Sequence, residues 1–385
     1  MRRIIKIILV LGLSISLSGI VPSTFSVVSA ASGITQSSYT PIHIYLNNTQ
    51  ITSSAGAPSL RNGTLMLPLD GLYISGATVN YDEHTKMITI ANMFTKGSIK
   101  VGSRYASVNG KRVVYSESPQ QINKQLYLPL RFVNDAIGGS LNWNAASRRA
   151  DINYPEFVGD GKVKNDAYFI NGVNGTLYKR DTAGVIHSLG ISSANLEPGY
   201  IGDTRITFVK ISEDADLVTI QNSNGEPSMN LTVINLFVKK GAILRQSKGN
   251  YWQFYPEDVK IYGGNAVMND GHYIRLIAPD ASVKATWNVS ILAGEPDLSY
   301  SIEAIGENYL IVRSSQEGLL TLIDMETNEA ILLYKEFSIL PSDMPGFKYD
   351  GIHFTGKDEN QSELQFEFTN NNKVKSTFTY QLGDQ

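Results

Sequence analysis

Histidines and carboxylates are the side chains of this sequence that could bind a metal ion or move a proton. The five histidines lie far apart, at His43, His84, His187, His272 and His353. No two of them have the spacing of an HExxH or HxH zinc motif, and no calcium-loop pattern D-x-[DN]-x-[DN]-G occurs. We therefore expect no metal site and no cofactor.

Hydrolytic chemistry would need a nucleophile or a pair of acids. No G-x-S-x-G motif is present, so the sequence shows no hydrolase nucleophile of that kind. A glycosidase uses two carboxyls that lie roughly 5–9.5 Å apart. Asp214, Asp216, Glu257 and Asp258 are the first candidates for such a pair. We expect a protein that is not an enzyme, and a polysaccharide-active enzyme is the alternative.

Aromatic side chains could stack on sugar rings or anchor a protein partner, and they cluster in the sequence YWQFYPED from residue 251. On a strand, Tyr251 and Tyr255 face one way while Trp252 and Phe254 face the other. Because aromatic residues often fill β cores, we expect Trp252 and Phe254 to be buried. Tyr251 and Tyr255 are then the candidates for exposed ligand contacts.

The N-terminal part of the chain contains an internal repeat. Residues 64–90 and 125–152 share the triplet Leu-Pro-Leu, at 67–69 and 128–130, and Gly76 matches Gly138. Tyr81 occupies the position of Trp143. A fixed period of this kind indicates one structural unit that is used twice.

Each unit is expected to have the order β-β-β-α-β-β. In copy two the helix is predicted from the apolar spacing after Leu130, and Gly138-Gly139 should end it. The dipeptide Asn109-Gly110 predicts a β-hairpin. A unit of about 55–60 residues is too small to cover its helix alone, so the copies should pack as one body.

Trp143 and Tyr81 are expected to belong to the core of this body. Trp143 should lie beneath the helix of its own unit or at the seam between units, so that Trp143→Ala would cost about 3–5 kcal/mol. If Trp143 lay on the surface instead, it would be the best ligand-stacking candidate in the chain.

The motif of copy two, LPLRF followed by a glycine pair and a tryptophan, resembles the copper amine oxidase N-terminal domain-like, or stalk domain, family. The resemblance covers about residues 42–153; copy one departs from it, with Asp70-Gly71 in place of Arg131-Phe132 and Tyr81 in place of the tryptophan. The resemblance implies an extracellular accessory module for adhesion or spacing in the Gram-positive cell envelope. It carries no copper ligand onto any residue of this sequence.

Short alternating strands separated by Asn-Gly and similar turns dominate residues 155–385. The layouts that begin at Ala167, Asn308 and Gly351 are alike, and two further segments fit with longer loops. They resemble β-propeller blades of about 40–45 residues, of which five would fill the region. The fold class expected for the whole chain is therefore mainly β, with duplicated small α+β units followed by a propeller-like domain. A β-sandwich is the alternative for the C-terminal part.

The sequence begins with a cationic segment, an apolar run and Val28-Ser29-Ala30, the pattern of a secretory signal peptide that is cleaved after residue 30. A flexible leader (31–40), the stalk-like repeat (41–154, with units of about 41–97 and 98–154) and the propeller-like region (155–385) should follow. No second apolar run of membrane-spanning length occurs. The chain should therefore be secreted, and it could be associated with the cell wall.

Composition narrows the choice of partner. The chain has no cysteine, so an exported form would depend on core burial and sheet pairing for stability. A net charge of −3 without basic runs argues against nucleic acid. The sequence thus favours a secreted, non-catalytic binding or scaffold protein of the bacterial cell envelope. Its partner would be a cell-wall polysaccharide or an envelope protein.

Overall fold

The computed structural model describes residues 41–52, 56–70, 72–159, 166–194, 196, 203–225, 229–252, 258–346, 349–357 and 363–382. The expected signal peptide and leader lie outside these ranges. Within them, no helix combines the length and the apolar character that crossing a lipid bilayer requires.

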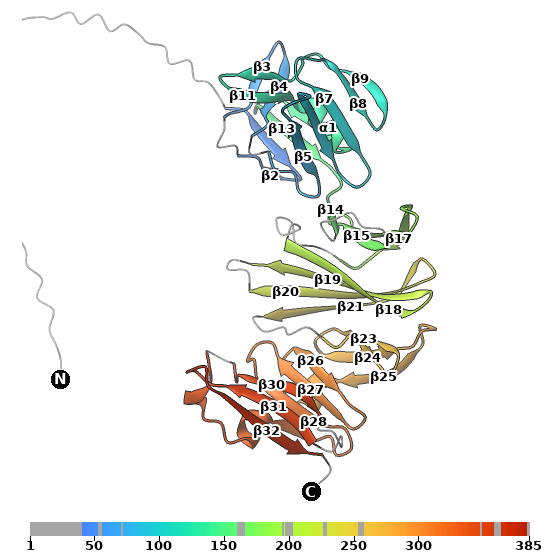
Figure 1. The fold of residues 1–385 in the computed structure, drawn as a ribbon, viewed down its shortest axis with the longest axis vertical. Helices are drawn as coiled ribbons and strands as arrows, with labels where there is room; N and C mark the ends of the chain where they lie inside the picture. Colours follow the sequence, from blue (N-terminus) through green and yellow to red (C-terminus); the bar gives the residue numbers. More distant parts are fainter. Residues whose placement is uncertain are drawn as a thin grey trace, which may run out of the picture. The chain divides into compact units, whose positions relative to one another are not determined.

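The described residues of the N-terminal region (41–154) form thirteen strands and one helix (Figure 1). In chain order these elements are β1 (His43–Leu46), β2 (Thr49–Gln50), β3 (Ser59–Arg61), β4 (Thr64–Pro68), β5 (Thr78–Asp82), β6 (Met87–Ala91), β7 (Lys96–Lys100), β8 (Tyr105–Val108), β9 (Lys111–Val114), β10 (Gln120–Ile122), β11 (Gln125–Pro129), α1 (Leu130–Ala136), β12 (Ser140–Asn144) and β13 (Arg149–Asn153).

Each of the three sheets described in this region combines strands from the two copies of the repeat. The sheet orders are β12-β13-β1-β2, β10-β11-β4-β3 and β5-β6-β7-β8-β9, so each sheet contains strands of both copies. The two Leu-Pro-Leu motifs pair with each other, because β4 and β11 are antiparallel with Leu67 opposite Leu128. The prediction that the copies pack as one body is confirmed.

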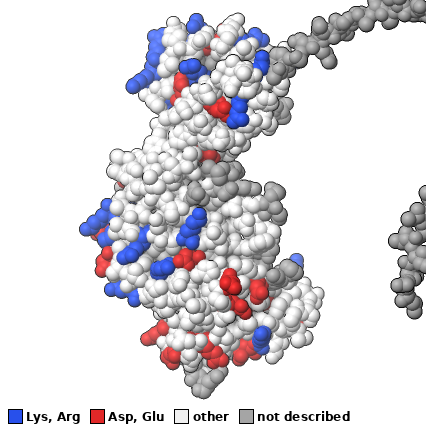
Figure 2. All heavy atoms as spheres, turned by 180° about the vertical axis from the view of Figure 1, so that it is seen from behind, with Lys and Arg blue, Asp and Glu red and all other residues white. Residues whose placement is uncertain are grey.

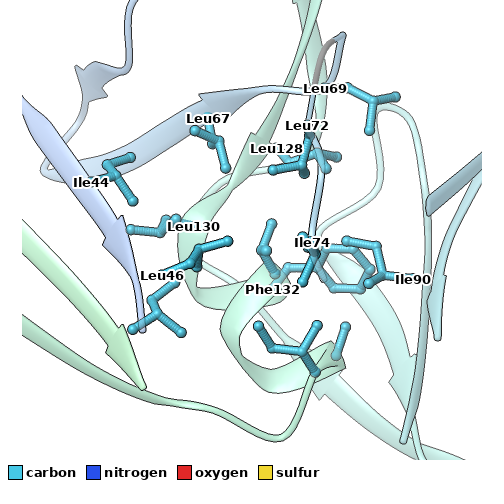
Figure 3. Close-up of a cluster of buried hydrophobic side chains, with 14 of the residues drawn as sticks. Ile44, Leu46, Leu67, Leu69, Leu72, Ile74, Ile90, Leu128, Leu130 and Phe132 are labelled. Atoms are coloured by element: carbon cyan, nitrogen blue, oxygen red, sulfur yellow. The ribbon is translucent and has the colours of Figure 1, made fainter. Parts of the chain in front are cut away.

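A single hydrophobic core joins the copies. Phe132, Val133 and Ile137, in and just after α1, are fully buried against strands from both halves. Figure 3 shows Leu128, Leu130 and Phe132 of copy two in the same cluster as Ile44 and Leu67 of copy one. Gly138 ends the helix with a φ of 72°, as the sequence predicted.

Only copy two forms a helix among the described residues, so the expectation of one helix per unit is wrong. The segment after Leu69 in copy one is irregular at residues 72–77, although Leu72 and Ile74 still fill the core. Asp70-Gly71 stands where copy two has Arg131-Phe132. Glycine in a helix costs about 1 kcal/mol relative to alanine, and aspartate is also a weak helix former, so this segment has little intrinsic tendency to be helical.

The C-terminal region forms five consecutive antiparallel sheets, which we call blades 1 to 5. Blade 1 contains β14 (Phe157–Gly159), β15 (Ala167–Asn171), β16 (Thr176–Arg180) and β17 (Ile186–Ile191); blade 2 contains β18 (Thr204–Ser212), β19 (Ala215–Asn224), β20 (Asn230–Lys239) and β21 (Ala242–Trp252); blade 3 contains β22 (Ile261–Tyr262), β23 (Asn265–Asn269), β24 (Tyr273–Ile277) and β25 (Val283–Asn288). Blade 4 contains β26 (Tyr300–Ile305), β27 (Tyr309–Ser314), β28 (Leu320–Asp324) and β29 (Ala330–Leu332); blade 5 contains β30 (Ile352–Lys357), β31 (Glu363–Thr369) and β32 (Lys375–Gln381). Helices α2 (Val289–Leu292) and α3 (Leu333–Glu336) each span four residues.

Each blade packs face to face on the next through a hydrophobic cluster. One cluster joins blades 1 and 2, and three others join blades 2 and 3, 3 and 4, and 4 and 5. Because the central blades are covered on both faces, β19 is buried continuously from Ala215 to Ile220. These stacked antiparallel meanders, with four described strands in blades 1 to 4 and three in blade 5, confirm a propeller-like, all-β region. Among the described residues no cluster joins blade 5 to blade 1, so the likeness to a propeller lies in the blades and their stacking.

A buried arginine connects the last two blades. Arg313 of β27 donates to Glu303 Oε1 at 2.5 Å and to Asp350 Oδ1 at 2.9 Å. It also donates to the carbonyl oxygens of Gly318 and Ile352. Burial alone would lower the pKa of this guanidinium, but the charges of Glu303 and Asp350 raise it. Arg313 is therefore a buried, charged side chain that links blades 4 and 5, and we call it the structural tie between them.

Candidate functional site: a cleft beside Trp143

Trp143 lies at the rim of the N-terminal core. It is opposite Ala150 across β12 and β13, and Leu141 is opposite Ile152 on the same face. Ala150 and Ile152 are fully buried, whereas Trp143 keeps 40% of its surface exposed. The prediction that Trp143 is buried is wrong, because β12 carries it beyond the packed part of that face.

A cleft of about 250 Å³ opens next to this indole. Its walls come from β3, β4, β11, β12, β13, the segment after β9 and the first turn of α1. The lining residues are Leu60, Gly63, Thr64, Leu65, Tyr115, Ser116, Pro129, Leu130, Arg131, Leu141, Trp143 and Ala150. We call this the Trp143 cleft.

The hairpin that forms one wall is fixed by its turn. Asn62 and Gly63 both have positive φ, at 46° and 75°, as the tight turn between two strands requires. The Asn62 side chain donates to Glu117 Oε1 at 2.8 Å, which ties the turn to the segment after β9. The dipeptide Asn62-Gly63 is a hairpin signal, and it is the feature of the sequence that could have located this wall.

Tyr115 joins the cleft to the helix. Its hydroxyl donates to Asp135 Oδ2 at 2.9 Å, and its ring meets Phe132 edge-on with centroids 5.9 Å apart. Burial and the neighbouring Asp135 carboxylate raise the pKa of Tyr115 well above its usual range. Tyr115 is therefore a neutral, fixed support for the cleft.

The residues of the Trp143 cleft suit binding and do not suit acid–base catalysis. Trp143 offers an aromatic face, Leu60 and Leu65 offer aliphatic walls, and Thr64 and Ser116 offer hydroxyls. Arg131 is the cation among the lining residues, and none of the described lining residues is a carboxylate. A saccharide ring, which has an apolar face and polar edges, fits such a lining.

The matching position in copy one does not form an equivalent site. Tyr81 is opposite Ile88 across β5 and β6 and is partly buried against the common core. The expectation that Tyr81 contributes to the core is confirmed, and the two related positions differ in exposure.

Comparison with known families bears on this half of the chain. Residues 45–152 match the family model of the copper amine oxidase N-terminal domain. The match covers both copies of the repeat and confirms the resemblance drawn from the Leu-Pro-Leu motifs. The Trp143 cleft thus lies within the copper amine oxidase N-terminal domain match. No curated protein matches the sequence.

Solved structures with partial similarity are β-propellers and related proteins. The WD40 domain of SCAP from fission yeast is 9% identical, with a TM-score of 0.23, and the alignment covers 82% of this chain and 65% of that one. Virginiamycin B lyase from Staphylococcus aureus is 9% identical, with a TM-score of 0.26 and coverage of 83% and 88%. The Cps50 (Swd1) β-propeller domain from Myceliophteria thermophila is 8% identical, with a TM-score of 0.24 and coverage of 68% and 86%. This similarity transfers no activity and no ligand.

In the C-terminal region, the aromatic residues that begin at Tyr251 differ from the prediction in their exposure to solvent. Tyr251 is only 2% exposed, and its ring lies against Gly249, where an added Cβ would be 2.8 Å from the Tyr251 hydroxyl oxygen. Trp252 is 51% exposed. The predicted orientations of both residues are therefore wrong, because the face of β21 that carries Tyr251 packs on blade 3. Tyr255 and Phe254 lie outside the described residues.

The three candidate acids that the structure describes are each held by a different structural partner. Asp214 accepts from Lys239 at 2.8 Å, and Asp258 accepts from the backbone N–H of Ile302 at 2.7 Å. Asp216 is bound by Lys179 at 2.8 Å and by the Tyr168 hydroxyl at 2.5 Å. Glu257 lies outside the described residues.

Two of these acids have shifted pKa values with clear causes. Burial would raise the pKa of Asp216, but Lys179 and Tyr168 hold it below its usual range. The ion pair with Lys239 lowers the pKa of Asp214. Within the described ranges, no group of three or more His, Asp or Glu residues could hold a metal ion.

Proposed function

We propose that this chain is a secreted, non-catalytic binding protein of the bacterial cell envelope, and that its Trp143 cleft takes a saccharide unit of the cell wall. The observation that carries the proposal is the half-exposed indole at the mouth of a cleft lined by apolar side chains, hydroxyls and one arginine.

The chemistry of a cell-wall sugar complements this lining. The C–H face of a pyranose ring stacks on an indole, and an N-acetyl methyl group fits an aliphatic wall such as Leu60 and Leu65. A sugar that carries a carboxylate would pair with the guanidinium of Arg131. A cleft of about 250 Å³ suits one or two sugar rings better than a protein surface.

The architecture supports a binding or scaffold role for the whole chain. A stalk-like N-terminal domain is followed by a propeller-like region, and both are built from repeated small sheets. The described candidate acids, Asp214, Asp216 and Asp258, are occupied by structural partners, which favours a non-catalytic protein. Secretion is proposed from the N-terminal sequence pattern.

The proposal is tested by retention of the purified chain on insoluble peptidoglycan and on whole cell envelopes. An unrelated secreted protein of similar charge serves as the control. We expect retention on both materials and release by soluble muropeptides from a muramidase digest. Retention on envelopes that disappears after protease treatment of those envelopes, with none on peptidoglycan, would identify an envelope protein as the partner instead. No retention above the control on either material would end the envelope-binding proposal.

A further inference from the structure

A second surface of the chain has a chemistry unlike that of the Trp143 cleft. A groove of about 650 Å³ lies between β21 of blade 2 and β24–β25 of blade 3. Its lining residues are Arg245, Gln246, Ser247, Lys248, Met268, Asp270, His272, Tyr273, Arg275, Ile277, Val283 and Thr286. We call it the basic groove. Figure 2 shows several Lys and Arg side chains over the middle of the C-terminal region, with Asp and Glu side chains among them.

The groove has an excess of positive charge in a chain whose net charge is −3. Arg245, Lys248 and Arg275 are its cations, and Asp270 is the acid among the described lining residues. Asp270 is already engaged: its carboxylate accepts from Arg275 at 2.7 Å and from the backbone N–H groups of His272 and Tyr273. Within the described ranges, Arg245 and Lys248 have no carboxylate within ion-pair distance.

Two of the charged groups are held in position by the blades. Arg245 donates through Nε to the carbonyl oxygen of Ala281 at 3.1 Å, which bridges blades 2 and 3 and leaves its terminal nitrogens for another acceptor. Arg275 lies 5.1 Å from the centre of the Tyr273 ring while it contacts Asp270. A guanidinium that is fixed in this way loses little side-chain entropy when it binds an anion.

Tyr273 adds a flat surface to these charges. It is 39% exposed, and it is the aromatic residue among the lining residues of the groove. An aromatic face next to guanidinium groups matches a sugar ring that bears a carboxylate. A phosphodiester chain without rings would use only the cations.

We infer that the basic groove binds an acidic saccharide, whose carboxylates meet Arg245 and Lys248 while one ring stacks on Tyr273. This site is separate from the Trp143 cleft. Its ligand would carry negative charge, which complements the positive charge of the groove. It would give the chain a second attachment point on a mixed neutral and acidic glycan surface.

The test is calorimetric titration of the full chain with three probes at low and moderate salt. The probes are tetragalacturonate, a glycerol phosphate oligomer of equal charge and neutral maltotetraose. We expect tetragalacturonate to bind most tightly, with an affinity that falls as salt rises. The double variant Arg245→Gln/Lys248→Gln should weaken it at least tenfold, and Tyr273→Ala should weaken it about threefold or more. The double variant Lys100→Gln/Lys111→Gln, at two exposed lysines of the N-terminal region, removes the same charge and should bind as the wild type does.

The outcomes separate this inference from the proposed function. The titrations are repeated in the Trp143→Ala background, because Arg131 of the Trp143 cleft could also pair with a carboxylated sugar. The groove should keep its affinity for tetragalacturonate in that background, so a loss of peptidoglycan retention leaves this result unaffected. Glycerol phosphate binding as tightly as tetragalacturonate, with no effect of Tyr273→Ala, would overturn the saccharide assignment. Equal binding of maltotetraose, or no binding of any probe, would overturn the site itself.

Discussion

Leu67 and Leu128, the first leucines of the two Leu-Pro-Leu motifs, lie opposite each other on the antiparallel strands β4 and β11. Their exposed fractions are 1% and 0%. The repeat therefore pairs with itself at the centre of the N-terminal region, and neither copy has a complete core without the other.

This pairing predicts strong effects from truncating either leucine. Leu128→Ala should lower the local stability of the N-terminal region by about 2–5 kcal/mol, because it removes a fully buried side chain from the shared core. Amide hydrogen exchange of peptides from both copies should report the loss, including those of β6 in copy one. Leu60→Ala, at an exposed leucine of β3, should change protection very little. Faster exchange confined to copy two would contradict a shared core.

The buried tie between blades 4 and 5 gives a second prediction. Arg313→Met should destabilise these blades by about 3–5 kcal/mol, because it leaves the carboxylates of Glu303 and Asp350 without their cation. Lys375→Met, which breaks the exposed pair with Glu367, should cost less than about 1 kcal/mol. Thermal unfolding of the two variants measures the contrast. Similar melting temperatures would show that Arg313 is not a structural tie.

Asp216 gives a prediction about pH. Lys179 and Tyr168 hold its folded-state pKa below the value of about 3.9 expected in the unfolded chain. The ionised carboxylate therefore stabilises the fold above that value, and this stability is lost as pH falls through the folded pKa. The difference in melting temperature between wild type and Asp216→Asn should be widest near pH 7 and should narrow as pH falls below about 4.

The control for this experiment is Glu307→Gln at an exposed position, which should show a small difference from wild type at both pH values. A gap between wild type and Asp216→Asn that is as wide at pH 3 as at pH 7 would contradict the assigned role of the Asp216 carboxylate.

Much of the fold could be predicted because its signals are local. The Asn109-Gly110 turn, the end of α1 at Gly138 and the five repeated blades all follow from turn chemistry and strand periodicity. The pairing of β1 with β13, more than a hundred residues later in the chain, has no local signal. It arises because each copy can cover its core only with strands of the other.

The candidate site was harder to predict because strand parity alone does not determine exposure. Trp143 does face the core side of its sheet, but it lies where that side opens to solvent. The orientations of Tyr251 and Trp252 depend on which face of β21 meets blade 3, and the sequence pattern around them does not reveal this. Both errors concern tertiary packing near the ends of strands.

The exposure of Trp143 changes what its removal should do to stability. Trp143→Ala should cost about 1–2 kcal/mol, less than the 3–5 kcal/mol of a fully buried tryptophan, since 40% of its surface is already in water. Hydrogen exchange in β12 and β13 measures this cost. A loss as large as that of Leu128→Ala would show that the indole is mainly a core residue.

The most direct test of the account is the binding isotherm of Trp143 variants on purified peptidoglycan. We predict that Trp143→Ala binds at least tenfold more weakly than wild type, equivalent to about 1.4 kcal/mol, while Trp143→Phe stays within about threefold. Trp252→Ala removes a tryptophan of similar exposure outside the Trp143 cleft and should bind as wild type does. If Trp143→Ala is folded and binds as tightly as wild type, or if Trp252→Ala causes the loss instead, the Trp143 cleft is not the glycan site.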